Sequence, residues 1–376
     1  MPDLRAMNEH LIILGASTRA AATSARRAGL VPWCADLFAD ADLQRIATVQ
    51  KVPYDEYPAG LLRALECAPP GPVLYSGALE NRPDLIGRID RPLWGNSATV
   101  LRAARSPARW EALLRAHGIA CPQTAHEPRR DGDWLIKPHR SAGGVGIARY
   151  RGEPFHPRTH FLQQRIDGEP CSAIYLGTAN HDAVLLGVTK QLIGIPWLNA
   201  KPFQYCGTIG PTSIDGATKT QWQRLGSALA KLGLRGLFGV DAILRDGLPW
   251  PVEINPRYTA SIEILERSQA RAFLTLHRGV FEGQAVPISE QDQGNGVWAK
   301  AILFARRDFT FPAEVSWLAS LEGGQDLDAA LFADIPHPGQ LIEQGWPILT
   351  LFARGSSEME CTAQMQGRAT ELERHF

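Results

Sequence analysis

Apolar and polar residues alternate in short runs through the first 97 residues. The run HLIIL, residues 10–14, ends at a glycine and leads into a stretch rich in alanine and arginine. This pattern is typical of a strand, a tight turn and a helix. Further apolar runs, VPWCAD from residue 31 and GPVLYSG from residue 71, predict more strands. Because strands that alternate with helices favour a parallel sheet, we expect a parallel α/β domain over residues 1–97.

The next segment, residues 98–270, is expected to be a second domain of α+β type. A helix opens it, with Ser106 as a cap, Pro107 at its first position and Gly118 after its end. Short strands and glycine turns follow, and then a second helix near residue 220. A hairpin, GVDAILRDGLPWPVEIN over residues 239–255, closes the segment, and its Asp-Gly pair is a strong turn signal.

The remaining residues, 271–376, predict a small β-rich third domain. Its two most regular apolar runs are VWAKAILFARRDFTF, residues 297–311, and GWPILTLFARG, residues 345–355. Many turn residues separate them. The predicted fold class is therefore α/β and α+β, with three domains at 1–97, 98–270 and 271–376.

Composition excludes several classes of function. The formal net charge of the 376 residues is +0, so no general field favours nucleic acid or anionic lipid. No run reaches about 18 apolar residues, and the first residues lack the apolar stretch of a signal peptide, so a cytoplasmic protein without a membrane partner is expected. The six cysteines are scattered singly, which predicts reduced thiols rather than disulfides or a zinc site.

The hairpin carries the strongest candidate chemistry. Glu253, Asn255 and Arg257 stand at alternate positions, so they share one face if the strand continues that far. An antiparallel pairing would bring Asp241 close to Glu253. Two carboxylates and an amide oxygen form a hard oxygen site that suits Mg²⁺. The competing interpretation is an exposed polar strand face.

Two upstream segments carry weaker signals. In WLIKPHRSAGGVGIA, Lys137 ends an apolar strand, and a loop with Gly143, Gly144 and Gly146 follows. Such a loop can approach an anion closely through its backbone N–H groups, although an ordinary glycine hairpin with a surface lysine fits the same letters. The segment FLQQRIDGEP, residues 161–170, is by itself typical of a plain edge strand.

The order of these three elements resembles the ATP-grasp superfamily over about residues 100–265. The resemblance implies an ATP-grasp fold in which two α+β subdomains hold ATP between them. It implies that Lys137 contacts the α and β phosphates and that the loop of Gly143, Gly144 and Gly146 folds over the phosphates. It further implies adenine contacts from Gln163, Gln164 and Ile166, a ribose contact from Glu169, and metal ligation by Asp241, Glu253 and Asn255.

Two cations complete the site that the resemblance implies. Arg257 would steady the acyl-phosphate, and Lys190 would approach the γ-phosphate. The superfamily often has a second phosphate-binding lysine just after residue 105. This chain has ARSPARW there, so Arg105 or Arg109 must substitute. The segment from Trp197 to Tyr205, with Phe203, could form an aromatic wall for a flat substrate or could be ordinary core.

The implied activity is that of an ATP-dependent ligase. It would use ATP and Mg²⁺, with Mn²⁺ as an alternative, to activate a small-molecule carboxylate as an acyl-phosphate for attack by an amine. The domain layout resembles biotin carboxylase and the purine-biosynthetic ligases. The phrases ADLFADADL, TKQLIG and FQYCGTIGP resemble ATP-grasp proteins of methylotroph one-carbon cofactor biosynthesis, of methanopterin and methanofuran type. A bicarbonate-using carboxylating enzyme and a non-catalytic ATP-binding regulator are the alternatives, and a homodimer stays open.

Overall fold

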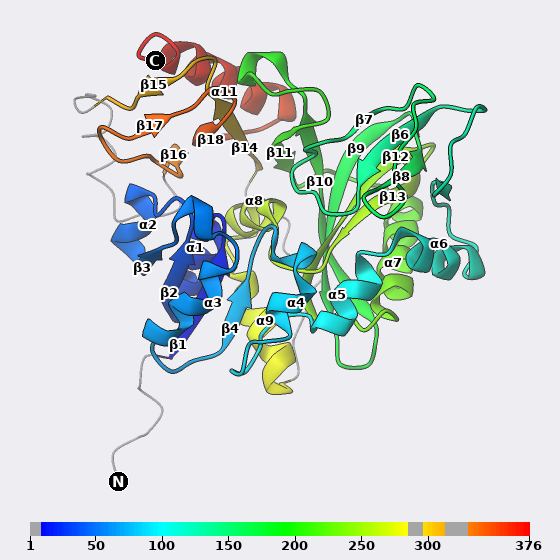
Figure 1. Cartoon of the computed structure of the whole chain (residues 1–376), viewed down its shortest axis with the longest axis horizontal. Helices are drawn as coiled ribbons and strands as arrows, with labels where there is room; N and C mark the ends of the chain where they lie inside the picture. Colours follow the sequence, from blue (N-terminus) through cyan, green and yellow to red (C-terminus); the bar gives the residue numbers. More distant parts are fainter. Residues whose placement is uncertain (1–8, 285–295, 313–329) are drawn as a thin grey trace.

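The computed structural model describes residues 9–284, 296–312 and 330–376, and it arranges them as four β-sheets flanked by helices (Figure 1). The N-terminal part, residues 9–97, lies beside both the middle part, residues 98–270, and the C-terminal part that follows it (Figure 1). The three parts are arranged around the centre of the molecule (Figure 1). The division into three domains at residues 97 and 270 remains a prediction. The largest sheet crosses the second of these boundaries, since it includes strands from both sides of residue 270.

The first sheet is parallel and has the strand order β3-β2-β1-β4, as the alternation of strands and helices predicted. All of β1 except its first residue is buried, in agreement with the apolar run HLIIL. Its strands are β1 (His10–Gly15), β2 (Val31–Asp36), β3 (Thr48–Lys51) and β4 (Val73–Tyr75). The helices here are α1 (Arg19–Arg27), α2 (Ala41–Ile46), α3 (Gly60–Ala64) and α4 (Pro83–Ile86), with short 3₁₀ turns at Tyr54–Glu56, Leu65–Cys67 and Leu79–Asn81.

Two helices lead to a small antiparallel sheet. The helices are α5 (Ala98–Ala104) and α6 (Pro107–Ala116), and Pro107 occupies the first position of α6, as predicted. The small sheet has the order β5-β8-β6-β7. Its strands are β5 (Thr124–Ala125), β6 (Trp134–Pro138), β7 (Ala148–Arg149) and β8 (His160–Gln164).

The largest sheet has eight strands in the order β13-β12-β9-β10-β11-β14-β18-β16. Helix α7 covers one face, packing on Ala173 and Tyr175 of β9, whereas Ile174 and Leu176 point to the other face and contact α8 and α9. This alternation is the period of two that a strand requires. The elements are β9 (Glu169–Gly177), β10 (Ala183–Ile193), a 3₁₀ turn at Pro196–Leu198, β11 (Tyr205–Gly210), α7 (Gly216–Ala230), β12 (Gly236–Arg245), β13 (Leu248–Asn255), α8 (Ala260–Gln269) and α9 (Phe273–Glu282).

The C-terminal segment extends the same sheet, and it contains a helix that its β-rich pattern did not indicate. Helix α11 (Glu358–Leu372) begins at Ser357, whose hydroxyl accepts a hydrogen bond from the backbone N–H of Glu360. Its inner face packs on β14 and β18. The strands of this segment are β14 (Val297–Phe304), β15 (Phe309–Thr310), β16 (Phe332–Ala333), β17 (Leu341–Ile342) and β18 (Pro347–Gly355).

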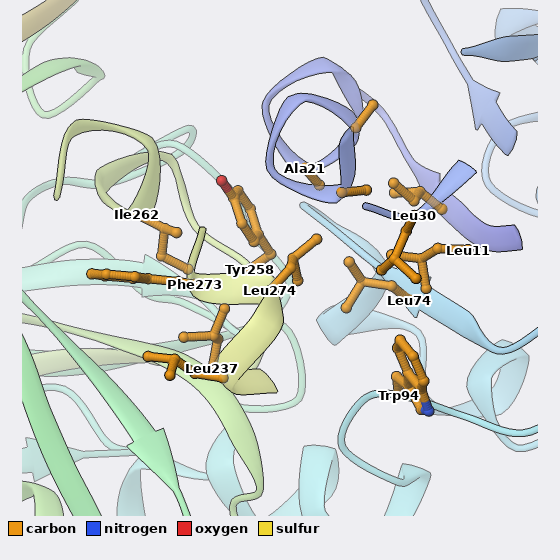
Figure 2. Close-up of a cluster of buried hydrophobic side chains, with 14 of the residues drawn as sticks. Leu11, Ala21, Leu30, Leu74, Trp94, Leu237, Tyr258, Ile262, Phe273 and Leu274 are labelled. Carbon is orange, nitrogen blue, oxygen red and sulfur yellow. The ribbon is translucent and has the colours of Figure 1, made fainter. Parts of the chain in front are cut away.

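An apolar core joins the N-terminal sheet to the middle of the chain. Figure 2 shows Leu11, Ala21 and Leu74 from the N-terminal part facing Ile262 and Leu274, which come from α8 and α9. All five are at most 1% exposed. Burial of this size stabilises each large side chain by about 1.5–3 kcal/mol, so the two parts form one packed unit.

A buried ionic cluster joins the same parts a second time. Arg19 on α1 binds both carboxylate oxygens of Glu263 on α8, with Nη2–Oε2 at 3.1 Å, and its Nε lies 3.0 Å from Asp334 Oδ1. Lys300 Nζ on β14 lies 3.0 Å from Glu263 Oε2. Burial alone would raise the pKa of Glu263, but Arg19 and Lys300 outweigh it and hold the pKa well below its ordinary value. The cluster therefore holds α8 between two other parts of the chain.

Two expectations from composition can be compared with the described residues. In this part of the chain, no helix has the length and apolarity needed to cross a bilayer. The cysteines are free thiols, as expected, and five are buried, but Cys67 is exposed.

Candidate active site

The predicted hairpin forms from strands β12 and β13. Its turn residues, Asp246 and Gly247, have φ angles of 51° and 73°, and glycine and aspartate suit this left-handed region. Asp241 is directly opposite Glu253 in the register. The antiparallel prediction therefore holds for this pair. β13 ends at Asn255, so Arg257 lies just beyond the strand, yet it reaches the same cavity.

The hairpin forms one wall of a cavity of about 180 Å³. The small antiparallel sheet, the glycine loop, strands β9, β10 and β11, and the start of α8 form the rest. The polar residues that line it are Lys137, Ser172, Gln191, Tyr205, Asp241, Glu253, Asn255, Arg257, Thr259 and Ser261, and Gly143, Gly144, Phe203, Ile147 and Ile193 are among the others.

The two carboxylates carry most of the negative charge in this cavity. Asp241 accepts hydrogen bonds from Gln191 Nε2 and from Asn255 Nδ2, both at 2.9 Å. Burial, and then the charge of Glu253, raise the pKa of Asp241 to about 6. Burial acts in the same direction on Glu253, but Arg105 and Lys137 outweigh it and lower the pKa of Glu253. The pair thus concentrates negative charge that a bound cation would relieve.

The donor set fits a hard divalent cation. Asp241, Glu253 and Asn255 offer carboxylate and amide oxygens, which are Mg²⁺ ligands, and the metal ordinarily completes its octahedron with phosphate and water. Among residues 9–284, 296–312 and 330–376, no cluster of three or more His, Cys, Asp or Glu side chains is placed to hold a metal. A metal at this site would therefore depend on only two protein carboxylates.

Lys137 approaches the carboxylates from the small sheet. Its Nζ donates to Gln163 Oε1 at 3.1 Å and to the backbone oxygen of Val252 at 3.2 Å. Burial lowers the pKa of Lys137, and the positive charge of Arg105 acts in the same direction. Arg105 itself contacts Glu253 and donates to the backbone oxygen of Ser141 at 3.3 Å. Two cations thus face the carboxylate pair from outside the hairpin.

The glycine loop forms part of the cavity wall. Gly143 and Gly144 line the cavity, and the backbone oxygen of Gly143 accepts a hydrogen bond from the N–H of Tyr205 at 3.0 Å. Gly144 has a φ of 82°, and a Cβ on it would stand 1.9 Å from the backbone oxygen of Phe203. Only glycine permits so close an approach. Gly146 lies against Pro138 instead and does not line the cavity.

Arg257 lies at the far end of the cavity, against the N-terminal part. Its Nη2 is 2.7 Å from Glu80 Oε1 and 3.3 Å from Asn255 Oδ1, and Nη1 donates to the backbone oxygen of Tyr258 at 3.1 Å. The hydroxyl of Thr259, at the start of α8, is buried without a hydrogen-bond partner. A guanidinium beside a helix N-terminus attracts a carboxylate or phosphate.

Comparison with known proteins agrees with this arrangement. Residues 108–261 match the family model described as the ATP-grasp domain. The chain contains an ATP-grasp domain. An uncharacterized protein from Methanocaldococcus jannaschii is 27% identical over 130 residues, but the match covers only 34% of this chain and 29% of that protein.

Solved structures with the ATP-grasp fold extend the likeness beyond the domain. The L-amino acid ligase from Bacillus licheniformis has a TM-score of 0.68 at 16% identity, covering 97% of each chain. The biotin carboxylase domain of the Hydrogenobacter thermophilus 2-oxoglutarate carboxylase, solved with MgADP, ADP and bicarbonate, has a TM-score of 0.68 at 14% identity, covering 94% of this chain and 88% of that one. These likenesses confirm the predicted fold class.

Two predicted contacts of the ATP-grasp domain are not brought to the cavity. Lys190 lies between Glu169 and Glu358, with Nζ–Oε distances of 2.6 and 3.3 Å. By strand alternation, Lys190 and Glu169 belong to the face that α7 covers, whereas Gln191 and Asp241 belong to the cavity face. The structure therefore does not support the predicted γ-phosphate contact of Lys190 or the ribose contact of Glu169.

The predicted adenine residues do not line the cavity, although Gln163 is bonded to Lys137, which does. The side chain of Gln163 is buried and bonded to Lys137 and to Val252. The side chain of Gln164 accepts a hydrogen bond from the backbone of Gln123 at 3.3 Å, and Ile166 is buried beyond the strand end. Neither Gln164 nor Ile166 lines the cavity.

Sequence reasoning missed several lining or supporting residues. Gln191 follows Lys190 in the sequence, and its side chain lines the cavity where that of Lys190 was predicted. Ser172 is paired with Asp241 in the sheet register, and Glu80 comes from the N-terminal part.

Two arginines were predicted to replace the second phosphate-binding lysine of the superfamily. Arg105 contacts the carboxylate of Glu253, whereas Arg109 is exposed on α6. Of the proposed aromatic wall, Phe203 and Tyr205 line the cavity, and Trp197 packs on the C-terminal core.

Proposed function

We propose that the protein is an ATP-dependent carboxylate–amine ligase. The observation that carries the proposal is the convergence of Asp241, Glu253, Asn255 and Arg257 in one cavity with Lys137. This set has cations for phosphates, oxygens for a metal and a guanidinium for a carboxylate, which are the groups that phosphoryl transfer needs. The likeness of the fold to an L-amino acid ligase supports the same class of reaction.

In the proposed reaction, a carboxylate oxygen of the substrate attacks the γ-phosphorus of ATP, and ADP leaves. The amine nitrogen then attacks the acyl carbon of the resulting acyl-phosphate, inorganic phosphate leaves, and the amine gives up a proton. Lys137 and Arg105 would neutralise phosphate charge, and Arg257 would orient the carboxylate. Asp241, Glu253 and Asn255 would hold Mg²⁺ or Mn²⁺, which would supply further neutralisation of the phosphates.

The glycine loop contacts β11 beside the cavity, because the backbone oxygen of Gly143 accepts a hydrogen bond from the N–H of Tyr205. In the proposed reaction, the loop would shield this side of the cavity from solvent. A low local dielectric strengthens each charge interaction in the cavity. It also protects an acyl-phosphate from hydrolysis.

A second candidate is a carboxylating enzyme that activates bicarbonate. It is favoured by the likeness of the fold to a biotin carboxylase domain solved with MgADP and bicarbonate. Bicarbonate would occupy the same end of the cavity, near Arg257. A non-catalytic ATP-binding regulator is the alternative of another class.

The physiological substrates are proposed on resemblance alone. The sequence phrases noted above favour cofactor biosynthesis of tetrahydromethanopterin or methylofuran type. Mass spectrometry of ligands that co-purify with the protein tests this assignment directly. A co-purified pterin or furan supports it, whereas a purine precursor or an amino acid overturns it.

The decisive experiment measures ADP release with ATP and Mg²⁺. The purified protein is mixed with a panel of carboxylates, with and without amines, and in a separate arm with bicarbonate. Release that requires both a carboxylate and an amine supports the ligase. Release stimulated by bicarbonate alone supports the carboxylating enzyme. Tight ATP binding without release in any arm contradicts both enzymes and supports the regulator.

A further inference from the structure

A basic groove lies on the outer side of the ATP-grasp domain, away from the cavity. It has a volume of about 730 Å³ and is formed by α7, the end of α6 and the start of β10. Figure 1 shows α6 and α7 side by side at the outer edge of the molecule, and the two helices are in contact. Its charged residues are Lys219, Arg224 and Lys231, all exposed, and His117 stands at the wall.

No carboxylate among the described residues pairs with these three cations, and no acidic residue lines the groove. The neighbouring contacts are polar but uncharged. Arg224 Nη1 donates to Gln221 Oε1 at 3.2 Å, and Arg224 Nη2 lies 3.5 Å from the backbone oxygen of His117. A chain with a formal net charge of +0 thus has a groove of a single sign.

His117 holds one end of the groove in place. Its Nδ1 lies 2.9 Å from the backbone oxygen of Leu113, and its Nε2 lies 2.8 Å from Lys231 Nζ. Nδ1 therefore carries the proton and donates to Leu113, and Nε2 accepts from the ammonium of Lys231. This contact places the Lys231 side chain beside the end of α6.

The spacing of the cations decides between a compact anion and an extended one. Lys219 on α7 and Lys231, the residue directly after its end, are twelve positions apart, which is about 18 Å along the helix axis. A single phosphate cannot touch both ends. An extended chain of about six residues spans the same distance at about 3.3 Å per residue. Between them, the hydroxyl groups of Thr220 and Ser227 can accept further hydrogen bonds, whereas the side chain of Gln223 is bonded to β10.

We infer that this groove binds an extended acidic segment of a partner protein. Complementary charge along the groove would give the interaction its specificity and its rate of association. Because α7 packs on the sheet face opposite to Asp241, a segment bound here leaves the cavity open. The inference does not depend on the proposed ligase activity.

The test measures binding of a fluorescein-labelled peptide of about six glutamates by anisotropy. We expect saturable binding that weakens as salt rises, since exposed charges are screened within about 10 Å at 0.1 M salt. The triple variant Lys219→Glu, Arg224→Glu, Lys231→Glu should lose affinity by at least about tenfold. A neutral variant, Lys219→Gln, Arg224→Gln, Lys231→Gln, should lose part of the affinity, and it serves if the charge reversal unfolds the protein.

The matched control reverses three exposed arginines elsewhere, namely Arg88→Glu, Arg158→Glu and Arg374→Glu. It changes the net charge equally, and it should leave binding within about twofold of the wild type. Equal losses in both triple variants, or no binding by the wild type, overturn the inference. If tripolyphosphate competes as strongly as the unlabelled peptide, the inference that the groove binds an extended segment is wrong. If a short oligothymidylate binds more tightly than the peptide, and the glutamate triple variant of the groove loses this binding, the ligand is a nucleic acid rather than an acidic protein segment.

Discussion

Arg257 and Glu80 form an ion pair across the boundary between the ATP-grasp domain and the N-terminal part, with Nη2 2.7 Å from Oε1. The side chain of Glu80 is 1% exposed, so the pair is held in a low-dielectric setting. Glu80 occupies one edge of the guanidinium. The orientation of Arg257 at the cavity therefore depends on a residue outside the matched domain.

Arg257→Lys is expected to weaken binding of the carboxylate substrate. Lysine keeps a positive charge near Glu80, but it lacks the planar fork that binds a carboxylate through two parallel hydrogen bonds. The KM for the carboxylate should rise by about tenfold or more, with a smaller change in kcat. Steady-state kinetics measure both. Arg245→Lys, at the exposed end of β12 in the same hairpin, is the control, and an unchanged KM in Arg257→Lys contradicts the assignment.

Glu253→Gln is expected to remove Mg²⁺-dependent turnover. The amide keeps a hydrogen-bond acceptor for Arg105 but removes one of the two carboxylates that face each other in the hairpin. Turnover should fall by about 100-fold or more, while circular dichroism shows an intact fold. The exposed Glu371→Gln should behave as the wild type. If Glu253→Gln retains wild-type turnover, the metal assignment is wrong.

Arg105→Ala is expected to weaken ATP binding, and Arg109→Ala is not. The two arginines are close in sequence, yet Arg105 contacts Glu253 and Arg109 is exposed on α6. If Arg105 binds phosphate as proposed, losing its charge should raise the Kd for ATP by about tenfold, as measured by calorimetry. Similar effects of both substitutions would show that Arg105 has no special role.

Arg19→Met is expected to destabilise the whole chain. It leaves the buried Glu263 and the half-buried Asp334 without the guanidinium that bonds to both. Breaking a buried ion pair from one side costs about 3–5 kcal/mol, and urea unfolding measures the loss. Arg26→Met, exposed on the same helix, should cost less than about 1 kcal/mol. A small loss for Arg19→Met would mean that the apolar core alone joins the parts.

His277 is expected to make folding sensitive to acid. It is 2% exposed, and burial lowers its pKa from 6.5 to about 4. The unfolded chain therefore takes up this proton below pH 6.5, and the folded chain does so only near pH 4. The free energy of unfolding should fall as pH drops from about 6.5 to about 4, by up to about 3 kcal/mol from this group.

His277→Gln tests this dependence. Glutamine can accept from the N–H of Leu237 and donate to the backbone oxygen of Trp94, as His277 does. It does not titrate, so the variant should lose less stability than the wild type over the same pH range. Denaturant titrations at several pH values measure the difference. Parallel curves for both proteins would assign the acid sensitivity to other groups.

Local signals predicted the elements of the fold well. Asp-Gly marked the hairpin turn, Pro107 marked the start of α6, and the register placed Asp241 opposite Glu253. Each of these depends on a few neighbouring residues. Helix α11 was missed although its start, Ser357 followed by Glu360, has the Ser-x-x-Glu pattern of a capping box.

The site was harder to predict where the assignment depends on which of two neighbouring strand residues faces the cavity. In TKQLIG, either Lys190 or Gln191 could point to the cavity, and the letters do not say which, because a shift of one residue exchanges the two faces. The same alternation places Glu169 on the face of Lys190. Glu80 required knowledge of a contact between distant parts of the chain, which no local pattern contains.

The continuity of the large sheet limits how this protein can be divided. β11 pairs with β14 through residues 207–210, and β14 pairs in turn with β18. A chain cut after residue 270 would leave the backbone groups of β11 without partners along a buried edge. Such an edge recruits strands from other molecules. Excising the ATP-grasp domain for separate use would therefore yield an aggregating fragment, whereas tags and insertions belong at the exposed turn of the β12–β13 hairpin.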